Sequence, residues 1–172
     1  MEIRLLNEGD EKVFFQGMKA WEGDDLTWYT FAWKPGMSFQ QMLKILDDEK
    51  AGRNLQPGRV AHTMFYGFVD DEIIGRLSIR HELNDYLFHR GGNVGYSVAP
   101  KFRGKGYATQ MMKHALEYCR DELKLQKILV TCNDTNIASW KVIEKAGGVL
   151  EKKFVDDTDG ALVRRYWFQL TV

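Results

Sequence analysis

The sequence predicts one domain, residues 1–172, with a mixed α/β (α+β) fold in which a largely antiparallel sheet of about seven strands is flanked by about four helices. Three observations lead to this prediction. A length of 172 residues suits a single domain with its own core. Strand-like runs follow one another across short turns in the first half, as in antiparallel sheets. In the second half such runs alternate with helix-patterned segments, which is typical of strand–helix–strand crossovers.

The first elements precede a long aromatic segment. The pattern of residues 1–6 predicts a strand, and that of residues 11–20 predicts a short helix. Residues 21–36 are rich in aromatic and acidic side chains and predict an irregular loop. Ser38 is a suitable N-cap for a helix that begins at Phe39, because apolar residues then recur on one helical face.

A run of three strands is expected next. Residues 61–69 and 72–83 are strand-like and are joined by an Asp-Asp turn, which indicates a hairpin. Residues 84–92 read as a loop. The following strand, 93–100, must end near Pro100 because proline cannot donate a hydrogen bond to a sheet ladder.

The remaining elements alternate. Apolar residues on one face predict a helix over 108–123, and a continuous apolar run predicts a buried strand over 127–132. A second helix is expected over 137–146, followed by a glycine that can end it. Residues 148–156 and 162–172 form a final pair of strands.

Composition narrows the function classes. Apolar residues make up 44% and charged residues 28%, as in soluble globular proteins. The 24 basic residues are balanced by 24 acidic ones, which disfavours a nucleic-acid partner. Two cysteines and four histidines show no metal-ligand spacing, so no metal is expected. The polar start and the lack of a long apolar run predict a cytoplasmic protein without a membrane partner.

The stretch "RGKGYA", residues 103–108, carries the clearest chemical signal. Gly104 and Gly106 leave room for a ligand and tolerate unusual backbone angles. Successive backbone N–H groups can then form an anion nest, to which the start of the following helix adds its positive end. Arg103 and Lys105 add positive charge. The combination suits a pyrophosphate.

Three phosphate-binding patterns were compared with this turn. The nucleotide P-loop fails because Lys105 is followed by Gly106 rather than by serine or threonine. The dinucleotide fingerprint lacks its third glycine, where Thr109 stands, so a nicotinamide-dependent oxidoreductase is only a third alternative. The pattern Arg/Gln-x-x-Gly-x-Gly/Ala matches at Arg103, Gly106 and Ala108.

That third pattern resembles the coenzyme A loop of the GNAT N-acetyltransferase superfamily, and the chain resembles predicted, uncharacterised bacterial acetyltransferases. The segments "VGYSVAPKFRGKGYAT" and "ILVTCNDTNIASWKVIEKAGGV" both fit the family, so the cofactor motif covers 95–149. The resemblance implies a GNAT-like fold and an acetyl-CoA-dependent N-acetyltransferase, with acetyl-CoA or coenzyme A as co-substrate. It also implies two central strands that splay around a bulge, and a possible homodimer.

The resemblance also implies site residues. The cofactor-binding set is Tyr96, Ser97, Val98, Arg103, Gly104, Lys105, Gly106, Tyr107, Ala108, Thr109, Asn136 and Ser139. The N–H of Val98, or its neighbour, would face the thioester carbonyl and take a catalytic role. Other interpretations stay open: Asn136 also suits a helix cap, Ser139 a surface hydroxyl, Tyr107 a packing residue and Lys105 a solvated charge.

The catalytic acid and base are harder to assign. Many family members carry a tyrosine that protonates the leaving thiolate, but the corresponding position here is Ile143. Water, Tyr96 or Tyr166 would then serve, or no acid is needed, and a non-catalytic acyl-CoA-binding or sensor domain is the alternative function. Glu82 is the candidate base. The alternative interpretation is that Glu82 is an exposed carboxylate that pairs with Arg80 or His81. Asp85 and His81 are further candidates.

The acceptor is expected to be a primary amine of a small molecule or protein, with small molecules preferred. Asp24, Asp25 and Trp28 in the aromatic loop are candidates to receive it by ion pairing and cation–π contact. The alternative is that the aromatic residues of this loop anchor it to the core. Tyr86 is a candidate for a second rim.

Overall fold

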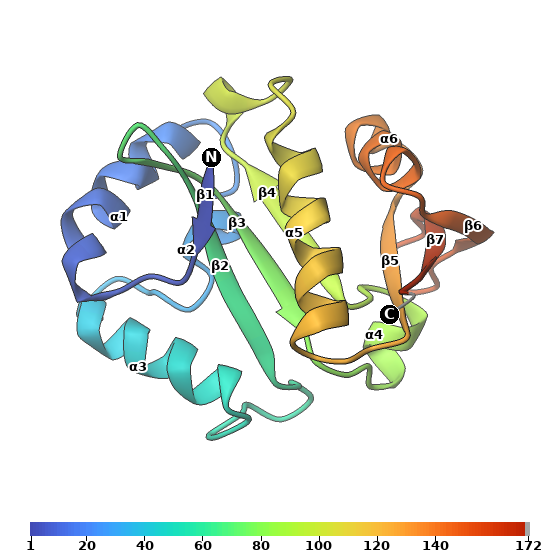
Figure 1. The fold of residues 1–172 in the computed structure, drawn as a ribbon, viewed down its shortest axis with the longest axis horizontal. Coiled ribbons are helices and arrows are strands. Elements are labelled where there is room, and N and C mark those ends of the chain that lie inside the picture. Colours follow the sequence, from blue (N-terminus) through green and yellow to red (C-terminus); the bar gives the residue numbers. More distant parts are fainter. Residues whose placement is uncertain (171–172) are drawn as a thin grey trace.

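The computed structural model describes residues 1–170 and confirms the mixed α/β fold class (Figure 1). Within this range the strands are β1 (Glu2–Arg4), β2 (His62–Val69), β3 (Glu72–Arg80), β4 (Val94–Val98), β5 (Lys127–Asn133), β6 (Val149–Val155) and β7 (Leu162–Gln169). The α-helices are α1 (Glu11–Gly17), α2 (Thr27–Thr30), α3 (Phe39–Lys50), α4 (Asp85–His89), α5 (Tyr107–Asp121) and α6 (Ile137–Lys145). None of these helices has the length and apolar content that a bilayer crossing requires.

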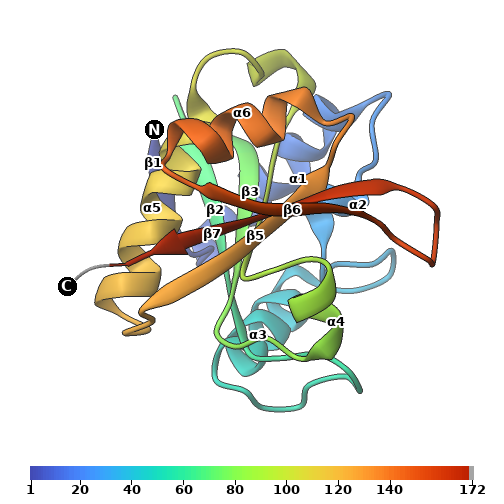
Figure 2. The ribbon, with the colours of Figure 1, turned by 90° about the vertical axis from the view of Figure 1, so that its right-hand side faces the viewer.

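The strands form two antiparallel sheets rather than one. The orders are β1-β2-β3-β4 and β5-β7-β6. An isolated bridge between Gly92 and Val130 links them, supported by a hydrogen bond of 2.7 Å from Asn93 N–H to Leu129 O. Figure 2 shows the second sheet in front, with α6 above it and α4 below. The expected splay between β4 and β5 is therefore present.

The bulge that was expected to accompany this splay is absent from β4. Its register with β3 runs from Val94 to Val98 without a shift. The register shift lies instead in the neighbouring pair, between Gly67 and Phe68 of β2. The splay thus begins at the Gly92 bridge, before β4 starts, and β4 itself stays a regular strand.

Helices cover both faces of the first sheet. Phe65 and Leu77 point to the face that α5 covers, whereas Met64 and Tyr66 point to the face covered by α1 and α3. This alternation follows from the two-residue period of side chains along a strand. In Figure 1, α1 and α3 lie on one side of β2 and β3, and α5 lies on the other.

Two glycines allow α5 to approach the sheet closely. Gly67 and Gly75 are cross-strand partners, and a Cβ at either would stand within 3.0 Å of the Cε atom of Met111 on α5. Met111 is fully buried. The glycine pair therefore sets the depth at which the first half of α5 rests on β2 and β3.

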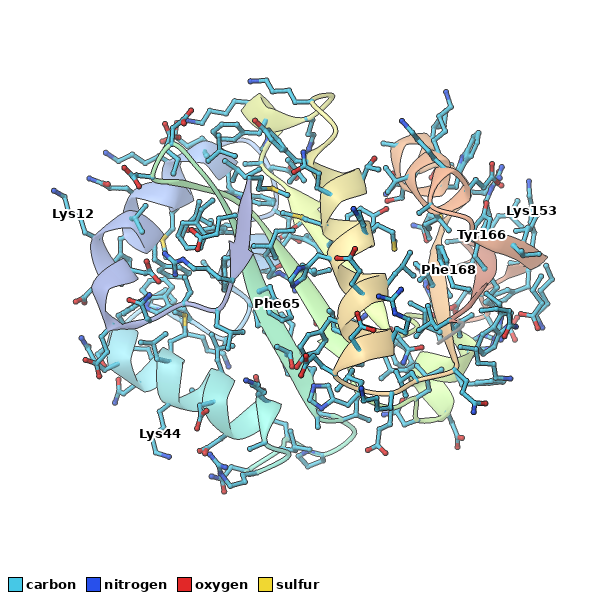
Figure 3. The ribbon with its side chains drawn as sticks, in the orientation of Figure 1. Lys12, Lys44, Phe65, Lys153, Tyr166 and Phe168 are labelled. Atoms are coloured by element: carbon cyan, nitrogen blue, oxygen red, sulfur yellow. The ribbon has the colours of Figure 1, made fainter. Side chains whose placement is uncertain are left out.

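The core continues past α5 into the second sheet. Phe65 of β2 and Tyr166 and Phe168 of β7 belong to one buried cluster with α5. Figure 3 shows Phe65 and Phe168 inside the molecule on either side of α5, while Lys12 and Lys44 extend outward. The second sheet is thus tied to the first through α5 as well as through the Gly92 bridge.

Several predicted boundaries change. The loop predicted over 21–36 contains α2, and the loop predicted over 84–92 contains α4, so more helices form than expected. Both helices are short, and short helices leave little periodic signal. The third strand ends at Arg80 rather than three residues later, and the last ends at Gln169. Residues 171–172, which were predicted to extend the last strand, lie outside the described residues.

Candidate active site

A cavity of about 570 Å³ lies where β4, α2 and the N-terminal ends of α5 and α6 meet. Nearly all of the predicted cofactor residues line it: Tyr96, Ser97, Val98, Arg103, Gly104, Gly106, Tyr107, Ala108, Thr109, Asn136 and Ser139. Lys105 is the exception. Its side chain is exposed, and its Nζ atom lies 5.4 Å from the centre of the Phe102 ring.

The glycine-rich turn has the backbone geometry that its sequence indicates. Gly104 and Gly106 have φ angles of +77° and +81°, and open space lies beside both. Gly106 is the N-cap of α5 and supplies no side-chain acceptor. The N–H groups of the first helical turn therefore have no intrahelical acceptor and remain available at the wall of the cavity.

Arg103 connects the turn to β4 and to the aromatic loop. Its Nε atom donates to the carbonyl oxygen of Val98 at 2.9 Å, and its Nη2 atom pairs with Asp24. The N–H of Asp25 and the guanidinium of Arg103 hold the pKa of Asp24 below its usual range. Asp24, a predicted acceptor residue, thus lines the same cavity as the predicted cofactor residues.

Asp25 has a local role. Its carboxylate accepts hydrogen bonds from the N–H and the hydroxyl of Thr27, at 2.9 and 2.6 Å. Asp25 does not line the cavity. Its carboxylate stabilises the start of α2, which carries Trp28.

One edge of β4 faces the cavity. Ala99 N–H donates to the carbonyl oxygen of Ile74 in β3 at 2.8 Å, which sets the alternation of hydrogen bonds along β4. Because alternate residues of an antiparallel strand bond to the same neighbour, Ser97 pairs with β3. The N–H groups of Tyr96 and Val98 then point away from β3, toward the gap between the sheets.

Tyr96 bridges this gap, and Asn136 lies beside it at the start of α6. The Tyr96 hydroxyl donates to the carbonyl oxygen of Ser139 on α6 at 3.3 Å, and burial raises the pKa of Tyr96 to about 12. Asn136 caps α6, since its Oδ1 atom accepts from Ser139 N–H at 3.1 Å. The capping interpretation of Asn136 is therefore confirmed. Its amide nitrogen has no protein acceptor within residues 1–170.

A second cavity of about 530 Å³ lies on the other side of Tyr96. It shares a wall with the first cavity: Trp28, Tyr96, Asn136 and Ser139. Tyr86 lines it from α4 and is 66% exposed, so this cavity opens to solvent there. Trp28 and Tyr86, both predicted on the acceptor side, are thus brought together.

The charges of the second cavity were not found by sequence reasoning. Arg90 is paired, since its Nη1 atom lies 2.8 Å from Asp159 and 3.1 Å from Asp156. Among residues 1–170, the Arg80 guanidinium donates to two carbonyl oxygens, those of Gly91 and Gly92, each at 3.4 Å. Burial lowers the pKa of Arg80 to about 10.

The predicted base is not brought into the site. Glu82 is exposed after the end of β3 and lines neither cavity, and no ion pair with Arg80 or His81 forms within the described chain. His81 instead lies with its Nε2 atom 2.8 Å from Thr63 Oγ1. Asp85 is exposed at the start of α4 and also lies outside both cavities.

The two residues considered for the leaving-group proton differ in position. Tyr166 lines neither cavity, and its hydroxyl donates to Glu144 at 2.8 Å. Ile143 is 1% exposed and forms part of the second cavity's inner wall. Of the two tyrosines, only Tyr96 lines the cavities.

Fold and sequence together define the class. Residues 1–149 match the family described as Acetyltransferase (GNAT) domain, and the chain belongs to this family.

Two curated relatives come from Bacillus subtilis (strain 168). The chain is 30% identical over 78 residues to the uncharacterized N-acetyltransferase YnaD, covering 45% of this chain and 44% of that protein. It is 32% identical over 78 residues to the probable N-acetyltransferase YjcK, covering 45% of this chain and 42% of that protein. The aligned region thus spans less than half of each relative.

Solved structures share the whole fold. A probable acetyltransferase superposes with a TM-score of 0.68 at 21% identity, over 97% of this chain and 91% of that chain. Spermidine N-acetyltransferase from Vibrio cholerae, in complex with CoA and spermine, superposes with a TM-score of 0.61 at 21% identity, over 98% and 95% of the two chains. At this identity the likeness concerns the fold.

Proposed function

We propose that this chain is an N-acetyltransferase that moves the acetyl group of acetyl-CoA to a primary amine. The observation that carries the proposal is the arrangement of two cavities that share a wall at Trp28 and Tyr96. One offers unpaired backbone donors for a long phosphate-bearing ligand. The other opens to solvent and can admit an amine from the opposite side.

The residues of the first cavity suit the parts of coenzyme A. The uncapped start of α5 and the turn at Gly104 and Gly106 suit the pyrophosphate, because backbone N–H groups and the helix dipole favour anions. Arg103 adds charge once it leaves Asp24. The free edge of β4 suits the amide groups of the pantetheine arm, which can pair with it as a strand would.

Acetyl-CoA supplies the acetyl group as a thioester. The amine lone pair forms a bond to the acyl carbon, the carbon–sulfur bond breaks, and its electron pair leaves with sulfur. The amine loses one proton, and the sulfur gains one to give the free thiol. The N–H of Val98 donates to the carbonyl oxygen as negative charge develops there. We assign the proton donated to the sulfur to the Tyr96 hydroxyl, which lines both cavities and would give up its bond to the carbonyl oxygen of Ser139 to do so.

The proton of the amine leaves through solvent in this proposal. Both carboxylates that line the cavities are already paired, Asp24 with Arg103 and Asp159 with Arg90. Glu82 stays a prediction that the geometry does not favour. Positioning of two substrates can supply most of the rate gain, so an acceptor that is partly neutral at the working pH is sufficient.

Two experiments test the proposal. Calorimetry should show binding of acetyl-CoA and none of NAD, whereas tight NAD binding would favour an oxidoreductase. Thiol release from acetyl-CoA across a panel of amines, with products identified by mass spectrometry, then tests transfer. Binding of acetyl-CoA without release for any amine would support a non-catalytic acyl-CoA-binding domain, which the apolar Ile143 favours.

A cytoplasmic location and a homodimer stay predictions of the same kind. A mass measured by light scattering at several concentrations decides the second.

A further inference from the structure

Three neighbouring arginines, one of which lines the second cavity, lack carboxylate partners. Within residues 1–170 no acidic oxygen lies within 4.0 Å of a guanidinium nitrogen of Arg59, Arg76 or Arg80. Arg59 and Arg76 both contact the Phe31 ring, at 4.9 and 4.8 Å from its centre. Arg76 and Arg80 lie four residues apart on one face of β3. The cluster is an uncompensated region of positive charge.

Within this cluster, Arg80 is the one that lines the second cavity. Its two weak contacts, to Gly91 O and Gly92 O, both use Nη1. The Nε and Nη2 donors form no bond with residues 1–170. These two groups form the edge of a guanidinium that binds carboxylates and phosphates with two parallel hydrogen bonds.

The backbone beneath Arg80 leaves room for its guanidinium. A Cβ at Gly95 would stand 3.2 Å from Nη1 and 3.4 Å from Nη2. Gly95 belongs to β4 and also lines the second cavity. The guanidinium thus rests on the strand whose far end carries the Val98 N–H.

Resting on the proposed function, we propose that the amine acceptor also carries an acid group, a carboxylate or a phosphate, and that Arg80 binds this group. Arg80 is half-buried, and a partly desolvated cation without an anionic partner is costly, so an acid group of the acceptor would compensate it. Arg90 needs no such partner because Asp159 and Asp156 already neutralise it. The same charges disfavour a polyamine, whose several positive charges would meet Arg80.

The acid group would bind Arg80 above Gly95, and the amine would react near the N–H of Val98. The length of β4 between these two residues therefore limits the size of the acceptor. Gly95 and Val98 are three residues apart, about 10 Å along a strand. The acid group and the amine of the acceptor must therefore lie within roughly this distance of each other. An α-amino acid or a short amino phosphate meets this limit.

Matched pairs of amines test the proposal. Each pair contains an acid-bearing member and the same amine without the acid: L-phenylalanine with phenethylamine, and O-phosphoethanolamine with ethylamine. Spermidine completes the panel. The expected result is that the acid-bearing member of at least one pair has a kcat/KM about 10- to 100-fold higher, as one charge-assisted bidentate contact provides. The pair that shows the preference identifies the acid.

Arg80→Gln should remove this preference and lower kcat/KM only for the acid-bearing member. Arg80→Lys should keep part of the preference that Arg80→Gln loses, since lysine retains the positive charge but not the two parallel donors of the guanidinium. Arg59→Gln, which removes one charge of the same cluster outside both cavities, should change the preference less than about threefold because the side chain is exposed. Equal loss for both members of a pair in Arg80→Gln would overturn the proposal, as would efficient acetylation of spermidine.

Binding separates this proposal from the proposed function. The CoA-saturated protein is titrated with the acetylated members of each pair. These are N-acetyl-L-phenylalanine with N-acetylphenethylamine, and N-acetyl-O-phosphoethanolamine with N-ethylacetamide. Tighter binding of an acid-bearing ligand that disappears in Arg80→Gln supports the acid site even if no amine is acetylated. Equal binding within a pair, or no binding of either acid-bearing ligand, overturns it. The melting temperature of Arg80→Gln should not fall, because the arginine has no ion pair to lose.

Discussion

Gly106→Ala should weaken coenzyme A binding far more than it weakens the fold. Gly106 has a φ of +81°, and nothing stands within 4 Å of the position that a Cβ would take. The substitution therefore meets no clash, and its cost comes from the backbone alone. That conformation costs an L-residue roughly 1–2 kcal/mol, and the smaller freedom of alanine in the unfolded chain offsets about 0.4–1 kcal/mol.

The net loss of stability is then about 0–1.6 kcal/mol, or a fall in melting temperature of at most roughly 6 °C. If the strained residue relaxes toward negative φ, the N–H groups at the start of α5 turn away from the ligand. Losing one charge-assisted hydrogen bond costs about 1.5–3 kcal/mol, which weakens binding roughly 10- to 100-fold.

Gly36→Ala is the matched control. Gly36 has a φ of +89° with open space beside it, and it lines neither cavity. Calorimetric titration with coenzyme A and thermal melts are measured for both variants. Similar melting temperatures with weaker binding in Gly106→Ala alone are expected. Wild-type affinity in Gly106→Ala would refute the assignment of this turn as the phosphate site.

Three further variants test the site. Tyr96→Phe should lower kcat about tenfold while coenzyme A binding stays within threefold. The ratio of the variant's kcat to that of wild type should be constant from about pH 7 to 10, because a pKa of about 12 keeps the Tyr96 hydroxyl protonated. An unchanged kcat would exclude Tyr96 as proton donor. Asp24→Asn should tighten coenzyme A binding about two- to fivefold by freeing Arg103. Because the pKa of Asp24 is lowered on folding, its stabilising effect is present above about pH 4 and is lost below it, so melting temperatures of wild type and variant should converge in acid. Glu82→Gln should leave kcat/KM and its pH profile unchanged; a large fall in kcat/KM together with loss of the acidic limb would reinstate Glu82 as the base.

Local sequence carried most of the information on the cofactor side. The turn at 103–108 and the capping of α6 by Asn136 involve residues that are close in the chain. Glycine spacing, helix starts and strand ends therefore report on them directly. Prediction of the fold class succeeded for the same reason, since strand and helix periods are local properties.

Two side chains lie in other surroundings than the sequence suggested, although their roles stay predictions. Glu82 was assigned from its place at the end of a predicted strand, but that strand ends at Arg80 and the carboxylate faces solvent. Asp24 was assigned to the amine by its charge, yet its partner is Arg103, which lies 79 positions away in the chain. Neither pairing leaves a periodic or spacing signal.

The sequence by itself determined the family, the order of the longer elements and a glycine-rich turn with the pattern of a phosphate site, because each depends on neighbouring residues. Only the tertiary structure decided which charges remain without partners. Arg80 resembles any other arginine in the sequence. In the fold it rests on Gly95 beside the second cavity, while the nearby carboxylates of Asp156 and Asp159 are bound to Arg90. An unpaired charge is a property of the surroundings in space, so the chemistry expected of the acceptor became visible only there.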